Sequence, residues 1–146
     1  MRRATMCGYV PTMAAGLAAL GILTLGLLNL PVVSRTLDSP SFCASCHAMS
    51  PQVESHLRSS HRDVPCGHCH LPRSTLRYPI AKAYSGSKDV LVFLSGATPP
   101  AIRLAPGGRR VVQQNCLGCH GAMVPNAAAR GGPYCLDCHR RVPHGP

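Results

Sequence analysis

The chain has 146 residues, and its 15 Lys and Arg outnumber its 5 Asp and Glu, giving a formal net charge of +10. This charge does not indicate nucleic-acid binding, because no aromatic or Lys/Arg-rich binding motif accompanies it. With no Trp, 2 Phe and 4 Tyr, the chain also lacks the aromatic bulk that an ordinary core of this size requires.

The N-terminal segment predicts a membrane anchor. Its apolar body from Thr12 to Pro31, about 20 residues, would form roughly 30 Å of helix, enough to cross a bilayer once. A cleaved signal peptide is the alternative, but its apolar region is normally shorter and ends in a small-residue site that is missing here. Because Arg2 and Arg3 precede the segment, we expect a cytoplasmic N-terminus and a signal anchor over residues 1–34. Residues 35–146 would then lie on the periplasmic side of the bacterial inner membrane.

The sequence Cys-x-x-Cys-His occurs four times beyond this anchor. It is the attachment site of a c-type haem, in which two thiols bind the porphyrin and the imidazole reaches the iron. The cysteines are Cys43, Cys46, Cys66, Cys69, Cys116, Cys119, Cys135 and Cys138, and the histidines are His47, His70, His120 and His139. Zinc ribbons are the alternative, since the Cys pairs have zinc-like spacing, but zinc does not require His after every second Cys. We therefore predict four covalently bound haem c groups.

These motifs define the expected architecture of the periplasmic part. They form two pairs, residues 43–70 and 116–146, joined by a linker over 71–115. The 14 Gly and 14 Pro mark frequent turns rather than long elements. We expect a mainly α fold with much irregular structure: one N-terminal transmembrane helix and a haem-packed tetrahaem domain of two dihaem units. Haem propionates, about eight negative charges, would offset most of the basic excess.

One stretch of the linker predicts a helix. Apolar residues recur at helical spacing from Thr75 to Leu94, with Ser74 or Thr75 as a plausible N-cap and Gly96 as the stop. The end over residues 90–94 is apolar on all sides, which is typical of a helix at a membrane surface. On the opposite face of a helical projection lie Tyr78, Lys82, Asp89 and Phe93.

Two charges on that face are candidate site residues. Lys82 and Asp89 are about 10.5 Å apart along the helix axis, too far for a direct ion pair, but both can contact one flat ligand. The alternative is a solvated face with two unrelated charges, and the sequence alone favours it.

The axial ligands of four irons outnumber the histidines that suit them. The motifs supply four of the eight ligands, and the remaining histidines are His56, His61, His68 and His144. His68 lies between two motif cysteines and cannot easily reach a second iron. At least one iron therefore keeps an open face, a non-His ligand or a ligand from another protein. Met49 is a candidate thioether ligand, although spacing alone favours His47 as the ligand and Met49 as a packing residue.

The pattern Cys43-x-x-Cys46-His47-x-Met49, three further haem motifs and the N-terminal anchor resemble the NapC/NirT family of membrane tetrahaem quinol dehydrogenases. The resemblance covers nearly the whole chain. It implies oxidation of menaquinol in the membrane and transfer of electrons to a periplasmic multihaem reductase, with the pentahaem cytochrome c nitrite reductase the first candidate. The chain would belong to a hetero-oligomeric complex with that enzyme.

The resemblance also implies roles for individual residues near the first haem. Met49, not His47, would be its proximal ligand, Asp89 would occupy its open side, and Lys82 would line the menaquinol pocket.

At the other haems, the resemblance makes His61 and His144 the distal ligands of two irons. A lysine of the partner enzyme would complete a further haem, which we expect to be that of Cys66 and Cys69. His56 has no role in this scheme. A membrane-tethered electron shuttle that never meets quinol is the main functional alternative. A terminal reductase is disfavoured, because nitrite reductases of this type use a Cys-x-x-Cys-Lys motif, and the sequence contains none.

Overall fold

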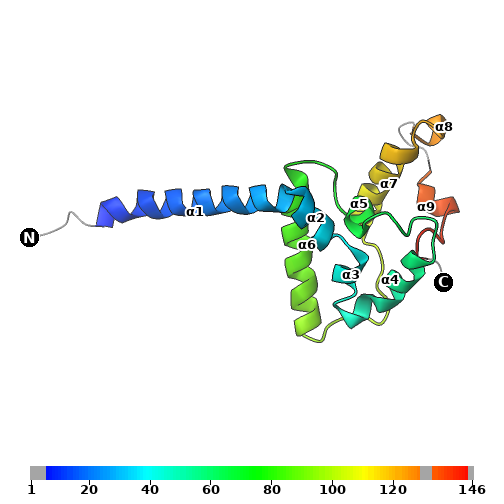
Figure 1. Cartoon of the computed structure of the whole chain (residues 1–146), viewed down its shortest axis with the longest axis horizontal. Coiled ribbons are helices and arrows are strands. Elements are labelled where there is room, and N and C mark those ends of the chain that lie inside the picture. Colours follow the sequence, from blue (N-terminus) through cyan, green and yellow to red (C-terminus); the bar gives the residue numbers. More distant parts are fainter. Residues whose placement is uncertain (1–5, 129–132, 145–146) are drawn as a thin grey trace, which may run out of the picture.

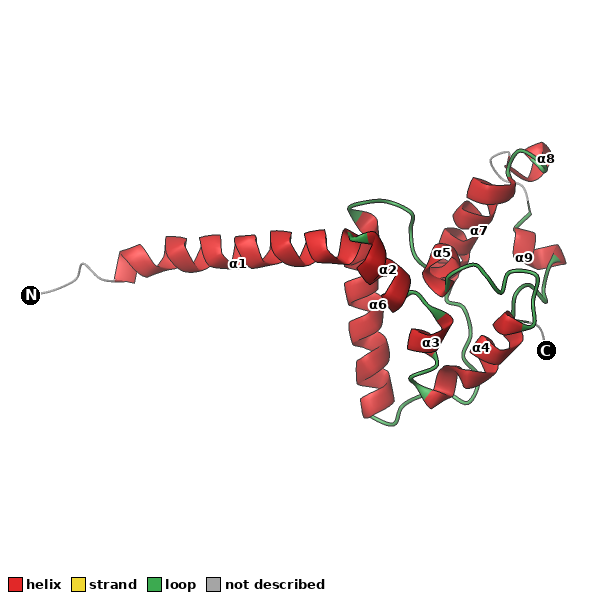
Figure 2. Cartoon of the chain, viewed as in Figure 1, coloured by secondary structure: helices red, strands yellow, loops and turns green. Residues whose placement is uncertain are grey.

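The computed structural model of the chain describes residues 6–128 and 133–144. Over these residues the chain consists of helices, turns and loops, without a strand (Figure 2). The expectation of a mainly α fold with much irregular structure is therefore confirmed. The elements are α1 (Met6–Asn29), α2 (Pro31–Leu37), α3 (Pro40–Cys43), the 3-10 turn η1 (His47–Met49), α4 (Ser50–Leu57), α5 (Cys66–His70), α6 (Arg77–Leu94), α7 (Pro106–His120), α8 (Pro125–Ala128) and α9 (Cys135–Cys138).

Helix α1 extends alone from the rest of the molecule (Figure 1). Its segment Val10–Asn29 has a mean hydropathy of 1.8 and none of it is buried by the rest of the chain, so it is long and apolar enough to cross a membrane. The helix ends at Asn29, slightly before the predicted limit, because Pro31 cannot continue it and instead begins α2.

Helix α6 contacts α1 and runs across its inner end (Figure 1). The sequence predicted this helix over Thr75–Leu94, and it spans Arg77–Leu94. It ends as predicted at Gly96, whose φ of 68° is the left-handed conformation that glycine adopts most easily. The N–H of Gly96 donates to the carbonyl of Phe93 at 3.2 Å and so satisfies one of the last free carbonyls of the helix.

The remaining helices are short and pack around the four Cys-x-x-Cys-His motifs, with α7 against both α5 and α9. Asn115 of α7 is buried and donates to the carbonyls of Cys69 at 2.9 Å and Leu71 at 2.8 Å, which fixes α7 against the end of α5. In the described part only three hydrophobic side chains are buried, those of Val53, Leu71 and Val112, and the ring of Pro79 is fully buried as well. So few buried apolar groups cannot stabilise a domain of this size, as expected if porphyrin is the main apolar component.

Candidate haem sites and an adjoining polar pocket

Short helices place the two thiols of each motif. The first motif begins at the C-terminal end of α3, the second coincides with α5, the third ends α7, and the fourth forms α9. Where the motif is helical, its two cysteines are three residues apart and so lie on the same side of the helix, as attachment to one porphyrin requires. Within the described residues none of these eight cysteines forms a disulfide, so all of them are available for haem attachment.

The four motifs are neighbours in space in the order in which they occur along the chain. The thiols interact across consecutive motifs in three pairs, Cys43 with Cys66, Cys69 with Cys119, and Cys116 with Cys135. The hydrogen bond between Cys43 and Cys66 lowers the pKa of Cys43 to about 7 and raises the pKa of Cys66. The motifs therefore form one connected series.

Of the three pairs of histidine rings about 6 Å apart in the described part, two include a motif histidine and are spaced as one iron between them requires. The ring centroids of His61 and His120 are 6.1 Å apart, and those of His70 and His144 are 6.0 Å apart. Two imidazoles on opposite sides of one metal have centroids roughly 6 Å apart, since each nitrogen lies about 2.1 Å from the metal. The distances thus fit two bis-His haem irons.

The contacts of His144 also suit a metal ligand. Its Nδ1 lies 2.9 Å from the carbonyl oxygen of Gln52, to which a protonated Nδ1 donates. That hydrogen bond leaves Nε2 unprotonated and free to bind iron. Burial lowers the pKa of His144, which favours the neutral imidazole that metal binding requires.

The last motif histidine, His139, is exposed like His70 and His120, but no other imidazole of the described residues lies near its ring. The ring of His144 lies 6.0 Å from that of His70 of the second motif, centroid to centroid. That the haem of Cys66 and Cys69 takes an external ligand stays a prediction.

At the first motif, His47 is exposed and Met49 is half-buried in η1. The His47 ring packs edge-on against Phe93 of α6, with centroids 5.3 Å apart. Phe93 lies on the helix face that the projection placed opposite the apolar one. The structure thus brings this face of α6 to the first haem motif, and it leaves both Met49 and His47 as candidate iron ligands.

His56, which had no predicted role, is 4% exposed and lies with its ring centroid 6.1 Å from that of His144. Its Nε2 is buried, and none of the described residues provides it with a hydrogen-bond partner. An unpaired buried nitrogen costs about 1–3 kcal/mol, so its position indicates that a further polar group belongs beside it. A haem iron or propionate in this region has the required chemistry.

The predicted site residues Lys82 and Asp89 have different environments. The Nζ of Lys82 lies 2.7 Å from Oδ1 of Asp38 and 2.7 Å from the carbonyl oxygen of Leu37. It also lies 5.6 Å from the centre of the Phe42 ring, next to the first motif. Asp89 is exposed and makes no ion pair with any described residue. The view of both as unrelated solvated charges is therefore wrong for Lys82.

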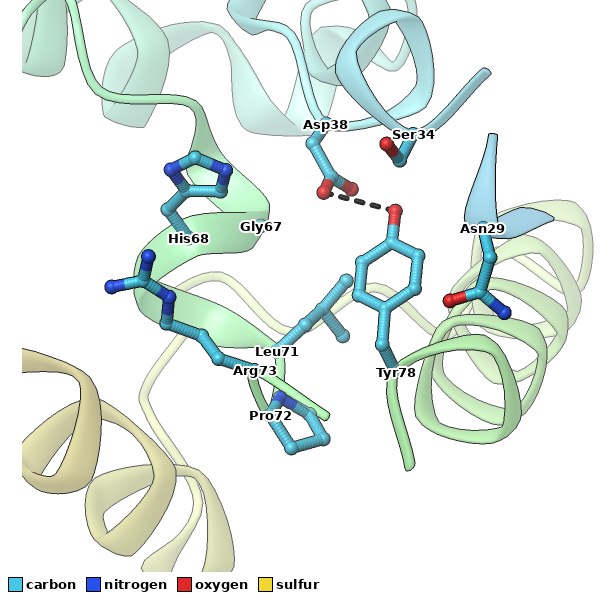
Figure 3. A pocket seen from close by; sticks show the side chains of 9 residues that line it. All are labelled: Asn29, Ser34, Asp38, Gly67, His68, Leu71, Pro72, Arg73 and Tyr78. Atoms are coloured by element: carbon cyan, nitrogen blue, oxygen red, sulfur yellow. Dashed lines mark hydrogen bonds between the residues drawn. The ribbon is translucent and has the colours of Figure 1, made fainter. Parts of the chain in front are cut away.

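Asp38 is the residue that the sequence analysis missed. It is 3% exposed, and its Oδ2 accepts a hydrogen bond from the Tyr78 hydroxyl at 3.0 Å (Figure 3). Burial, and secondarily the neighbouring carboxylate, raises the pKa of Tyr78, so this hydroxyl stays protonated. The sequence held one signal, because Asp38 is among only 5 acidic residues and lies between the anchor and the first motif.

A pocket of about 210 Å³ opens beside Asp38 and Tyr78, where α2, α5 and α6 meet (Figure 3). Asn29 and Ser34, at the end of the membrane helix and in α2, line one side of it, and His68 of the second motif lines the other. The residues that line this pocket thus come from the membrane anchor, from the second motif and from α6.

The zinc alternative finds no support in the described residues. Among them, no three His, Cys, Asp or Glu side chains are close enough together to hold a metal ion, whereas each zinc ribbon needs four convergent ligands. Free thiols in pairs, opposed imidazoles and a small side-chain core fit haem instead.

Comparison with known proteins agrees with this chemistry. The model of the NapC/NirT cytochrome c family, N-terminal region, matches residues 5–101. "Cytochrome c nitrite reductase subunit NrfH" of Nitratidesulfovibrio vulgaris is 36% identical over 129 residues, 86% of this chain and 81% of the relative. "Cytochrome c-type protein NrfH" of Wolinella succinogenes is 30% identical over 143 residues, 87% of this chain and 80% of that protein.

A solved structure shares the fold over nearly the whole chain. It is the "Crystal structure of cytochrome c nitrite reductase NrfHA complex bound to the HQNO inhibitor", with a TM-score of 0.72 at 30% identity, covering 94% of this chain and 90% of that one. One apolar N-terminal helix and these relatives make the protein membrane-anchored. The chain belongs to the NapC/NirT family of c-type cytochromes, which carry covalently bound haem c.

Proposed function

We propose that this protein is a membrane quinol dehydrogenase that carries four haem c groups. It oxidises menaquinol and passes the electrons to a periplasmic multihaem reductase, foremost cytochrome c nitrite reductase. The names of the NrfH relatives and of the NrfHA complex support the partner. The observation that carries the proposal is the position of Lys82, a nearly buried cation between the membrane anchor and the first haem motif.

The surface of α6 supports entry of a substrate from the membrane. Leu76, Ile80, Leu91 and Leu94 are between 61% and 74% exposed, although α6 contacts the helix that spans the bilayer. An apolar helix face beside a membrane span is stable at the level of the lipid headgroups and acyl chains. A quinol leaving the bilayer would meet α6 first. The arginines at positions 2 and 3 support a cytoplasmic N-terminus, with the haem motifs on the periplasmic side.

We assign the chain's residues to this reaction as follows. Bound haem supplies one-electron transfer, and the protein holds the quinol and removes its protons. Lys82 binds a quinol oxygen, and Asp89 accepts a proton near the open side of the first iron, whose proximal ligand is Met49. The exposure of Asp89 suits this role, because a proton acceptor must exchange with water.

For the other irons we pair His61 with His120 and His70 with His144, on the strength of their ring distances. The iron of His139 then takes its second ligand, a lysine, from the partner reductase. This assignment is supported by the ring distances alone, because no described imidazole lies near the ring of His139.

Direct reduction by a menaquinol analogue tests the proposal. Lys82→Ala and Asp89→Ala in the haem-loaded full chain should each lower kcat/KM for the quinol about 100-fold, as expected for a proton acceptor or substrate-orienting group. Haem content and reduction by dithionite should stay unchanged. Lys88→Ala is the matched control on the same helix, and loss of a solvated charge there should change the rate less than about fivefold. If Lys82→Ala and Asp89→Ala, like the control, change kcat/KM for the quinol less than about fivefold, the protein is an electron shuttle rather than a quinol dehydrogenase.

A further inference from the structure

The Lys82 ammonium has a limited number of hydrogen-bond donors. It carries three N–H groups and no acceptor. One donates to Oδ1 of Asp38 and one to the carbonyl of Leu37, both at 2.7 Å. One N–H is therefore left for a ligand, and the two fixed bonds determine its direction. A lysine without these bonds would instead sample many rotamers and lose that freedom when a ligand orders it.

Asp38 is itself fixed from three sides. The Tyr78 hydroxyl donates to its Oδ2 at 3.0 Å, and its backbone carbonyl accepts the N–H of Cys66 at 2.9 Å. Its carboxylate lies directly over Gly67, where a Cβ atom would overlap it. The end of α2, the second haem motif and α6 thus all hold the same carboxylate in place.

We propose that Asp38 is the positioning residue of the quinol site, holding the Lys82 ammonium so that its remaining N–H points to the quinol oxygen. This inference rests on the proposed function. Asp38 does not contact the substrate and acts through Lys82.

Amine labelling tests the contact independently of catalysis, because the chain has only two lysines, Lys82 and Lys88. In the haem-loaded full chain, acetic anhydride should modify Lys82 at least tenfold more slowly than the exposed Lys88. In Asp38→Asn, which keeps the shape but removes the charge, this difference should shrink by more than half. Equal labelling of both lysines in the wild type would overturn the proposal.

A double-mutant cycle tests the functional consequence. Asp38→Ala should raise KM for the menaquinol analogue about tenfold, and Asp38→Asn should raise it less, since its amide oxygen still accepts from Lys82. Adding Asp38→Ala to Lys82→Ala should raise KM no further, because both changes remove the same interaction.

A merely structural role for Asp38 predicts effects that multiply in the double variant, and that result would refute the proposal, as would an unchanged KM in both Asp38 variants. Loss of the exposed Glu54–Arg58 ion pair through Glu54→Ala is the control and should leave KM unchanged. If the wild type does not oxidise quinol, the proposed function fails, while the labelling result still decides whether Asp38 holds Lys82.

Discussion

The two ends of the haem series differ in how the chain covers them. At the first motif, Phe93 of α6 packs against the exposed His47 and Lys82 lies over the Phe42 ring, so side chains of α6 cover part of the site. At the last motif, Cys138 and His139 are both exposed, and no described aromatic ring packs against His139. A partly covered end near the membrane suits a small ligand, whereas an open end suits a protein surface. The direction of electron flow that we propose follows this difference.

The largest expected effect is the unfolding of the whole haem domain, which contains both ends of the series. Expression without the cytochrome c maturation machinery should leave residues 35–146 unfolded and rapidly digested by protease, while α1 stays in the membrane. The reason is that only three hydrophobic side chains of the described part are buried, so the protein cannot fold on its own core. Limited proteolysis and circular dichroism of the apo chain provide the measurement. A protease-resistant apo domain would contradict this prediction.

A smaller effect is expected from a substitution at one of the inner haems, which should leave the first and last haem motifs unchanged. His61→Ala should convert one haem from low spin to high spin, because the ring opposite His120 is lost. Electron paramagnetic resonance of the oxidised protein detects the change. His68→Ala is the control, since this exposed residue of the second motif faces no other ring in the described part. The assignment is wrong if His68→Ala alters the spectrum as much as His61→Ala does.

The smallest expected effect concerns the exposed apolar face of α6, the helix near the first haem motif. Leu91→Glu should raise KM for menaquinol a few-fold, because a charge on the exposed face of α6 moves the helix away from the lipid. The protein should remain in the membrane after a salt wash, since α1 anchors it. Kinetics in nanodiscs, with the exposed Leu57→Glu of α4 as the control, provide the measurement. Equal effects of the two substitutions would show that α6 does not lie on the bilayer.

Local features of this molecule could be predicted and long-range contacts could not. The haem motifs are pentapeptides, and the limits of α6 follow from its periodicity and from Gly96, so a short window of sequence contains the whole signal. The Asp38–Lys82 pair joins residues 44 positions apart, and no spacing rule relates them. The same holds for His70 and His144, whose pairing depends on how the C-terminal segment returns to α4 and α5.

The order of the thiol pairs has a kinetic consequence. Because thiols of each motif interact with thiols of the next along the chain, we expect the haems to form a linear series. In such a series every electron crosses every junction, so the slowest junction limits the current through the whole molecule. Tight coupling at the remaining junctions cannot compensate for one that is slow. A substitution that disturbs the contact between α5 and α7, such as one at Asn115, would then limit throughput as strongly as one at either end.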